Sequence, residues 1–277
     1  MNHLARFGAA SLALVSSVVA CGDAQVAPPV VPTAPPIPLA RPNPLGPKPE
    51  LAAAKPFAPP APQVFKLANG VTVWLFERHT LPVVAATLAV PSGSAADPPN
   101  QAGLAYMTAD MLDEGAGKRS AVELSTAIDD LGASLHTGGG VDGSTASLSV
   151  LKKNFAPAFA LLADVVARPR FDAKEWKRVS DLWKGDLKRR QDDPSAVAHV
   201  VERAVLYGPG TAYGHPSDGL LATAARVDLP SVKRFYDANW RPERAVLVVA
   251  GDVTQGEIAK LAEAELGGWK AKGAAAP

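Results

Sequence analysis

Apolar and polar positions from residue 64 onward recur with two periods, about 2 and about 3.6 residues, which are typical of strands and helices. The strand pattern covers 64–67, 71–76, 81–90, 132–137, 144–150 and 245–250. The helical pattern covers 103–115, 120–131, 154–167, 173–191, 195–207, 229–239 and 254–266. The pattern therefore predicts a folded region that mixes strands and helices and begins with three strands.

Short signals mark where several of these elements turn. Asn69-Gly70 lies between the first two strands and predicts a tight hairpin. The run 81–90 is almost continuously apolar, which predicts a well-buried strand. Ser120 and Glu123 have the spacing of a capping box at the start of a helix. The glycine-rich stretch 138–143 lacks the Lys-Ser/Thr ending of a phosphate-binding loop, so we interpret it as a flexible turn between two strands.

The first 63 residues have a different composition. Residues 1–20 have the basic start and short apolar core of a signal peptide, and Cys21 follows Val18-Val19-Ala20, which resembles a bacterial lipobox. We expect Cys21 to be lipidated, although an ordinary signal peptide with a chance cysteine gives the same pattern. Of residues 26–63, 14 are proline. Residues 21–63 are therefore predicted to form a lipid-anchored stalk, extending up to about 120 Å as polyproline II, rather than a ligand for proline-binding domains.

Length, charge and cysteine content limit the number of domains, the possible partners and the possible disulfides. The stretch 64–268 is long enough for one domain, and 269–277 is predicted to be a flexible tail or the start of a linker. The net charge of +1 and the lack of basic blocks argue against a nucleic-acid partner. The single cysteine excludes an internal disulfide framework.

The helix predicted over 103–115 carries the candidate chemistry. Tyr106 and Asp110 are four residues apart and share a face, with Ala109 beside them. An H-x-x-E-H zinc motif uses this spacing for two imidazoles and a glutamate that activates water. Here the three positions hold a phenol, a methyl group and a short acid. A helix with this spacing is ordinary by itself, so its meaning depends on the flanking sequence.

The flanks resemble the pitrilysin/insulinase family of zinc metallopeptidases. The resemblance covers Phe65 to about Asp252, and each of its pieces is weak alone but specific in this order. These pieces are Leu67-Ala68-Asn69-Gly70-Val71-Thr72-Val73, Gly103-Leu104-Ala105 with Met111-Leu112, Leu206-Tyr207-Gly208, Tyr213-Gly214-His215-Pro216, Phe235-Tyr236, Trp240-Arg241-Pro242 and Val248-Val249-Ala250-Gly251-Asp252. The resemblance implies an α+β fold, with a mixed, mostly antiparallel sheet and helices packed mainly on one face.

The resemblance also implies where a third metal ligand would lie, and there the chain has Asp186, while Val179 stands where an acidic residue is usual. A phenol is a poor ligand at neutral pH, because its pKa is about 10. Ala109 supplies no base. We therefore expect no catalytic residue, metal or cofactor. A carboxylate pair of Asp110 and Asp186 is a minor alternative, either sharing a proton or binding Mg²⁺ or Ca²⁺.

The resemblance further implies a peptide-binding edge strand at Leu135, His136, Thr137 and Gly138. Main-chain hydrogen bonds to such an edge do not need a metal. A merely protective or covered edge explains the same residues equally well.

The function expected from these observations is that of a noncatalytic pseudo-peptidase in the bacterial envelope, lipid-anchored and facing the periplasm. It would pair with an active zinc peptidase of the same family and help to enclose peptides, because the family usually has two or more such domains and this chain has room for one. Two alternatives stay open. One is an active zinc metalloendopeptidase, which would need zinc, and the other is a standalone peptide-binding envelope lipoprotein.

Overall fold

The computed structural model of the chain describes residues 46, 50, 52 and 56–273. The chain divides into two units, Met1–Phe57 and Ala58–Pro277. The predicted signal peptide, Cys21 and most of the proline-rich stretch lie outside the described residues. Within the described part of the chain, no helix has both the length and the apolar character needed to cross a bilayer.

The second unit contains a six-stranded sheet in the order β1-β2-β6-β3-β5-β4. Its strands are β1 (Gln63–Lys66), β2 (Thr72–Glu77), β3 (Val83–Val90), β4 (Ser134–Gly139), β5 (Ser144–Leu151) and β6 (Val246–Gly251). Strands β2 and β6 are parallel, and the other neighbouring pairs are antiparallel. The late strand β6 thus inserts between β2 and β3 and ties the two ends of the domain together.

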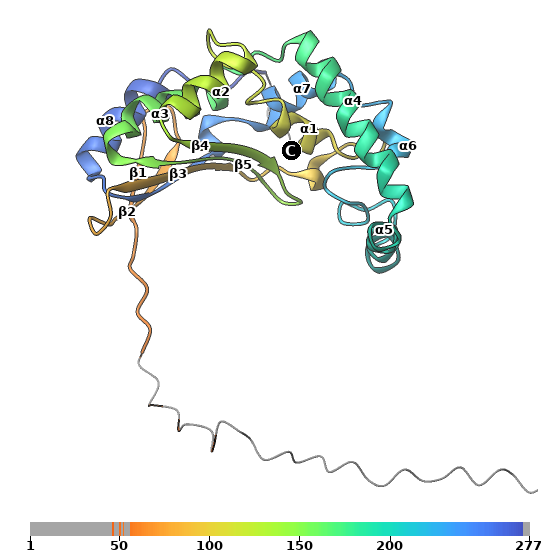
Figure 1. Ribbon diagram of the computed structural model, residues 1–277, viewed down its shortest axis with the longest axis horizontal. Coiled ribbons are helices and arrows are strands. Elements are labelled where there is room, and N and C mark those ends of the chain that lie inside the picture. Colours follow the sequence, from red (N-terminus) through yellow and green to blue (C-terminus); the bar gives the residue numbers. More distant parts are fainter. Residues whose placement is uncertain (1–45, 47–49, 51, 53–55, 274–277) are drawn as a thin grey trace, which may run out of the picture. The chain divides into compact units, whose positions relative to one another are not determined.

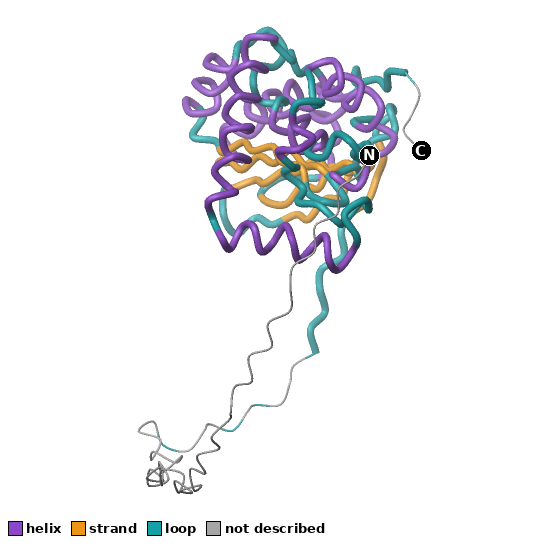
Figure 2. The backbone as a smooth tube through the Cα atoms, turned by 90° about the vertical axis from the view of Figure 1, so that its right-hand side faces the viewer, coloured by secondary structure: helices purple, strands orange, loops and turns teal. Residues whose placement is uncertain are grey.

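Most helices lie over one face of this sheet (Figure 1), and the second view shows these helices above the strands and one helix below them (Figure 2). They are α1 (Leu104–Asp110), α2 (Ala121–Asp130), α3 (Phe155–Ala167), α4 (Ala173–Arg189), α5 (Pro194–Tyr207), α6 (Leu221–Ala224), α7 (Leu229–Asn239) and α8 (Gln255–Leu266). Helices α4, α5 and α6 gather at one end of the domain (Figure 1). This arrangement confirms the predicted α+β fold class.

The predicted hairpin between β1 and β2 is confirmed. Val64 pairs with Trp74 across the two strands. Gly70 has φ +100°, a conformation that favours glycine, and its N–H donates to the Leu67 carbonyl at 3.0 Å. The Asn69 amide donates to the Leu266 carbonyl at 2.8 Å. The turn is therefore fixed against the end of α8 as well as by its own geometry.

Strand β3 is buried on one face only, so the prediction of a well-buried strand was wrong in this respect. Val84, Ala86, Leu88 and Val90 are at most 1% exposed, whereas the residues between them are exposed or half-buried. Side chains alternate between the two faces of a strand. Because most helices lie over one face, the apolar residues on the other face stay partly open.

Two predicted boundaries also differ from the structure. Helix α1 ends at Asp110, and Gly115 lies in the following loop with φ +99°. The hydrogen bond from Leu112 N–H to the Ala109 carbonyl, at 3.1 Å, spans only three residues and tightens the end of the helix. Strand β4 extends through Gly139, which pairs with Ser144, so the glycine-rich turn is shorter than predicted.

Candidate functional site

The start of α1 is held by a half-buried carboxylate, that of Asp97. The Asp97 Oδ2 atom accepts a hydrogen bond from the Gly103 N–H at 2.7 Å, and Oδ1 accepts one from the Ala105 N–H at 2.8 Å. Burial raises the pKa of Asp97 to about 7, although these N–H groups act in the opposite direction. Asp97 therefore fixes the position of the helix that carries the candidate motif.

Glycines allow α1 to pack closely on its neighbours. A Cβ atom on Gly103, whose φ is +96°, would lie 2.7 Å from Cζ2 of Trp183 on α4. A Cβ on Gly219 would lie 2.5 Å from the Ala102 carbonyl oxygen. The Trp183 indole N–H donates to the Asp218 carbonyl at 2.8 Å. Helix α1, helix α4 and the loop before α6 therefore form one close-packed frame.

Tyr106 lies half-buried on α1, with acids around it. Burial raises the pKa of its phenol, and the charges of Asp110, Asp218 and Asp186 raise it further. The phenol stays protonated at neutral pH, so Tyr106 is a poorer metal ligand than an unperturbed tyrosine would be.

The two neighbouring motif positions hold a buried alanine and a partly buried aspartate. Ala109 is completely buried in the hydrophobic core, and its methyl group can neither bind a metal nor accept a proton. Asp110 is partly buried. Burial and then the nearby Glu114 raise the pKa of Asp110, whereas Arg178 lowers it. The acid at this position is therefore less ready to ionise than a free aspartate.

Asp186 on α4 points to solvent. Its side chain is 62% exposed and pairs with Arg189, three residues later on the same helix. Val179, one of the buried residues of α4, packs in the core. In the residues that the structure describes, no three His, Cys, Asp or Glu side chains lie together as they would around a metal ion. The set of Tyr106, Asp110 and Asp186 does not fit the zinc motif, because it offers no imidazole, its phenol stays protonated and Asp186 is paired with Arg189 in solvent.

Asp113 is an ionisable group in this region that the sequence reasoning missed. It is half-buried, and desolvation, followed by the charges of Asp110 and Glu114, raises its pKa to about 6. The Thr137 hydroxyl hydrogen-bonds to its carboxylate and lowers the pKa. The only feature of the sequence that could have pointed to Asp113 is its position directly after Leu112, which is buried. Asp113 thus links the loop after α1 to strand β4.

The predicted peptide-binding residues lie on β4, which is the last strand of the sheet. Leu135 is buried, His136 is exposed, and Thr137 and Gly138 are half-buried. A Cβ on Gly139 would lie 3.0 Å from the Tyr106 Cα, so α1 packs on the face of this strand end. In the described part of the chain, no further strand pairs with the outer side of β4. The structure therefore brings Tyr106 and the end of the edge strand together.

The remaining described histidines take part in local pairs. His79 Nδ1 lies 2.7 Å from Asp252, and this hydrogen bond is the main cause that raises the pKa of His79. His199 Nδ1 lies 3.3 Å from Glu202 on the same helix, and His215 Nδ1 lies 3.0 Å from the Pro216 carbonyl. These are contacts on the surface and in turns.

Comparisons with known proteins point to one family. A family model described as "Insulinase (Peptidase family M16)" matches residues 72–212, and one described as "Peptidase M16 inactive domain" matches residues 226–277. An uncharacterized zinc protease of Bacillus subtilis, YmxG, is 26% identical over 207 residues, covering 75% of this chain and 50% of the relative. The beta subunit of the mitochondrial-processing peptidase of Dictyostelium discoideum is 24% identical over 202 residues, covering 72% and 42%. The chain spans about half the length of the curated relatives that it matches.

Solved structures show the same fold. A crystal structure titled as a peptidase M16 inactive domain from Pseudomonas fluorescens has a TM-score of 0.72 at 26% identity, covering 78% of this chain and 52% of the other. Pitrilysin has a TM-score of 0.68 at 23% identity, covering 78% and 24%. The periplasmic protease PqqL of Escherichia coli has a TM-score of 0.71 at 19% identity, covering 81% and 26%.

Proposed function

From the premise that this chain belongs to the insulinase family of peptidases, peptidase family M16, we propose that it is a noncatalytic, membrane-anchored subunit. It pairs with an active zinc peptidase of the same family and helps to enclose that enzyme's peptide substrates. One observation carries the noncatalytic role. Where a zinc motif needs two histidines and a glutamate, α1 presents Tyr106, Ala109 and Asp110 on an otherwise intact frame.

The chemistry of these residues supports the proposal. Zinc hydrolysis needs about three N, O or S ligands and a group that takes the proton of water. Tyr106 holds its proton, Ala109 has no acceptor, and Asp186 is drawn into a pair with Arg189. What this region can do is present a structured surface beside the edge strand β4. A peptide that adds to that edge gains main-chain hydrogen bonds that require no metal.

Pairing is supported by the kind of protein that the chain resembles. One relative is named as a subunit of a processing peptidase. The anchoring part of the proposal rests on the lipobox-like sequence before Cys21 and on the proline-rich stretch that follows. Labelled palmitate is expected to mark the wild type, and label that persists in Cys21→Ala would disprove lipidation at this residue.

Metal analysis with a peptide-cleavage assay tests the noncatalytic role. The full chain, purified in detergent and exposed to zinc, is expected to retain no stoichiometric metal and to show no chelator-sensitive cleavage of quenched peptides. Tyr106→Phe and Asp110→Asn should behave in the same way as the wild type. Stoichiometric zinc, together with cleavage that a chelator or Asp110→Asn abolishes, would instead establish an active zinc endopeptidase.

Affinity purification tests the pairing. A tagged full chain isolated from detergent-solubilised membranes of its own cells is expected to bring down a family member that has an intact H-x-x-E-H motif. Repeated isolation without such a peptidase would contradict pairing. If the chain is monomeric and binds extended peptides alone, it is a standalone peptide-binding lipoprotein.

A further inference from the structure

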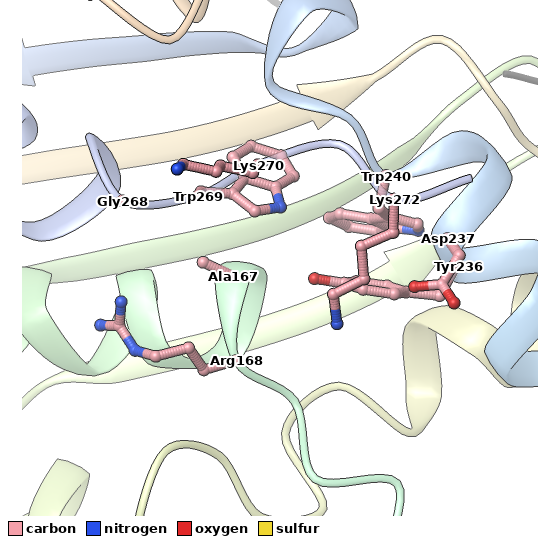
Figure 3. Close-up of a pocket in the computed structure, with 9 residues that line it drawn as sticks. All are labelled: Ala167, Arg168, Tyr236, Asp237, Trp240, Gly268, Trp269, Lys270 and Lys272. Carbon is pink, nitrogen blue, oxygen red and sulfur yellow. The ribbon is translucent and has the colours of Figure 1, made fainter. Parts of the chain in front are cut away.

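A pocket of about 210 Å³ lies between the end of α3, helix α7 and the segment after α8 (Figure 3). Three aromatic side chains and three cationic side chains line it: Tyr236, Trp240, Trp269, Arg168, Lys270 and Lys272. We call it the aromatic–cationic pocket. None of the candidate motif residues on α1 and α4 lines it.

The aromatic residues form a fixed wall. The rings of Tyr236 and Trp240, four residues apart on α7, are stacked with centroids 6.3 Å apart and planes inclined by 19°. The Tyr236 hydroxyl donates to the Val166 carbonyl at 2.6 Å. The main-chain N–H of Trp269 donates to the Leu266 carbonyl at 2.8 Å. All three rings belong to residues that are at most 5% exposed, so this wall is already formed before any ligand arrives.

Arg168, Lys270 and Lys272 lie around these rings (Figure 3), and all three residues are exposed. Among the described residues, neither Lys270 nor Lys272 is part of an ion pair, whereas Arg168 pairs with Asp164 at 2.5 Å. Arg241 donates to the carbonyl oxygens of Lys272 and Gly273, each at 3.1 Å, and so fixes the backbone there. One acid, Asp237, also lines the pocket. The balance of charge around the pocket is therefore positive and favours an anionic ligand.

A second hollow of about 220 Å³ continues from the first. It shares Arg168, Tyr236 and Lys272 with the first pocket and reaches Phe171. Phe171 has φ +48°, which is rare for a bulky residue, and its ring meets the Tyr236 ring edge-on with centroids 5.2 Å apart. Strained backbone of this kind persists only where the surrounding structure holds it in place. The two hollows therefore border the same rigid tyrosine.

The wall also contains an unused hydrogen-bond donor. The indole Nε1 of Trp240 is buried and has no partner in the described part of the chain. Buried polar groups without partners are rare in folded proteins and require an explanation. Because this N–H is closed off from solvent, it is part of the rigid wall and is not a contact for a ligand in the pocket.

We propose that the aromatic–cationic pocket binds a carboxylate carried on an aromatic ring. The carboxylate meets the ammonium groups of Lys270 and Lys272, and the ring packs against Tyr236, Trp240 and Trp269. Aromatic pairs gain from offset or edge-to-face contact, and charge-assisted hydrogen bonds are stronger than neutral ones. The source is either a free aromatic acid or the carboxyl end of a peptide whose last residue is aromatic.

Matched probes separate the ring from the charge. The full chain in detergent is titrated calorimetrically with phenylacetate, phenylacetamide and acetate. We expect phenylacetate to bind at least about tenfold more tightly than the other two, because only phenylacetate supplies both interactions. A peptide with a C-terminal phenylalanine is compared with its C-terminal amide. Preference for the peptide acid identifies a peptide end as the source, and preference for phenylacetate identifies a free acid.

Substitutions of the two lysines that line the pocket test whether phenylacetate binds there. The double substitution Lys270→Gln and Lys272→Gln is expected to weaken phenylacetate binding about tenfold or more and to leave phenylacetamide unchanged. Lys188→Gln, which removes an exposed lysine on α4, is the matched control and should bind like the wild type. Both lysines of the pocket are exposed, so folding is expected to persist, and circular dichroism checks it.

Three results would each overturn the site. They are acid and amide forms that bind equally, a loss in Lys188→Gln as large as in the double variant, or no saturable binding of any acid at millimolar concentration. None of these results depends on a metal, on cleavage or on a partner subunit. Failure here is therefore distinct from failure of the proposed function.

Discussion

The close-packed frame of α1, α4 and the loop before α6 has the packing of a binding site, whereas the aromatic–cationic pocket has side chains that can bind a ligand. The frame keeps close packing around Gly103 and Trp183 but presents acids and a protonated phenol where metal ligands would stand. The pocket presents cations beside buried rings, and no single motif of the sequence brings its three segments together. The comparison teaches that a frame can be fixed by contacts that do not involve its ligand positions. Intact packing is therefore no sign of intact chemistry.

The largest effect is expected from the tryptophan that joins α4 to α1. Trp183→Ala removes a buried ring and should lower the free energy of unfolding by about 3–5 kcal/mol. Leu182→Ala on the same helix is the control, because Leu182 is 59% exposed, and it should cost less than about 0.5 kcal/mol. Urea unfolding measures both. Equal costs would show that the frame does not depend on Trp183.

Since Trp183→Ala can unfold the domain outright, Trp183→Phe gives a milder test. It keeps a ring but removes the hydrogen bond from the indole to the Asp218 carbonyl. We expect a loss of about 1–3 kcal/mol, because the buried acceptor loses its partner. A phenylacetate affinity that stays at the wild-type value in this folded variant would show that the frame and the pocket are independent.

The contact between α1 and the edge strand gives the next largest effect. Gly139→Ala would place a Cβ 3.0 Å from the Tyr106 Cα, and backbone cannot yield as a flexible side chain does. We expect a cost of about 1–3 kcal/mol from this overpacking. Gly138→Ala is the matched control on the same strand, since no atom lies within 4 Å of its added Cβ. If both variants lose the same stability, α1 does not press on β4 at this point.

The sequence predicts much of the frame because its signals are local. Asn69-Gly70 marks the hairpin, and Ser120 with Glu123 forms the predicted capping box in the structure. The position of β6 between β2 and β3 has no local signal, because pairing between strands so far apart depends on the whole fold. Likewise, Gly138 and Gly139 suggest a turn, but pairing with Thr145 and Ser144 of β5 makes them part of a strand.

The two candidate regions differ in the same way. The spacing of Tyr106, Ala109 and Asp110 is visible on one helix, so the amino-acid sequence alone is enough to predict that the metal ligands are lost. The pocket gathers Arg168, Trp240 and Trp269 from three separate segments. No periodicity or spacing connects these segments along the chain. Only the packing of α7 against its neighbours brings their side chains together.

The pH dependence of stability tests the half-buried carboxyl that holds α1. Asp97 has a pKa of about 7 in the folded chain and, when unfolded, about 4. The folded state thus binds the proton more tightly, so stability due to Asp97 falls as the pH rises from about 4 to about 7 and then levels off. Asp113, with a pKa of about 6, acts in the same direction. Asp97→Asn should reduce this loss, as measured by urea unfolding at intervals across that range. A variant with the wild-type slope would contradict the assignment.

The smallest effect is expected at the position that the family resemblance assigns to a third metal ligand. Asp186 is 62% exposed and pairs with Arg189 on its own helix, so Asp186→Ala should change the free energy of unfolding by no more than about 0.5 kcal/mol. Asp181→Ala is a matched control, because Asp181 pairs in the same exposed manner with Lys177, four residues earlier. Zinc retention is measured beside stability in both variants. If Asp186 were a ligand, its removal would lower bound zinc and the removal of Asp181 would not. Identical zinc content in the two variants and the wild type is the expected result, because a carboxylate already paired with an arginine on its own helix is poorly placed to bind a metal beside α1.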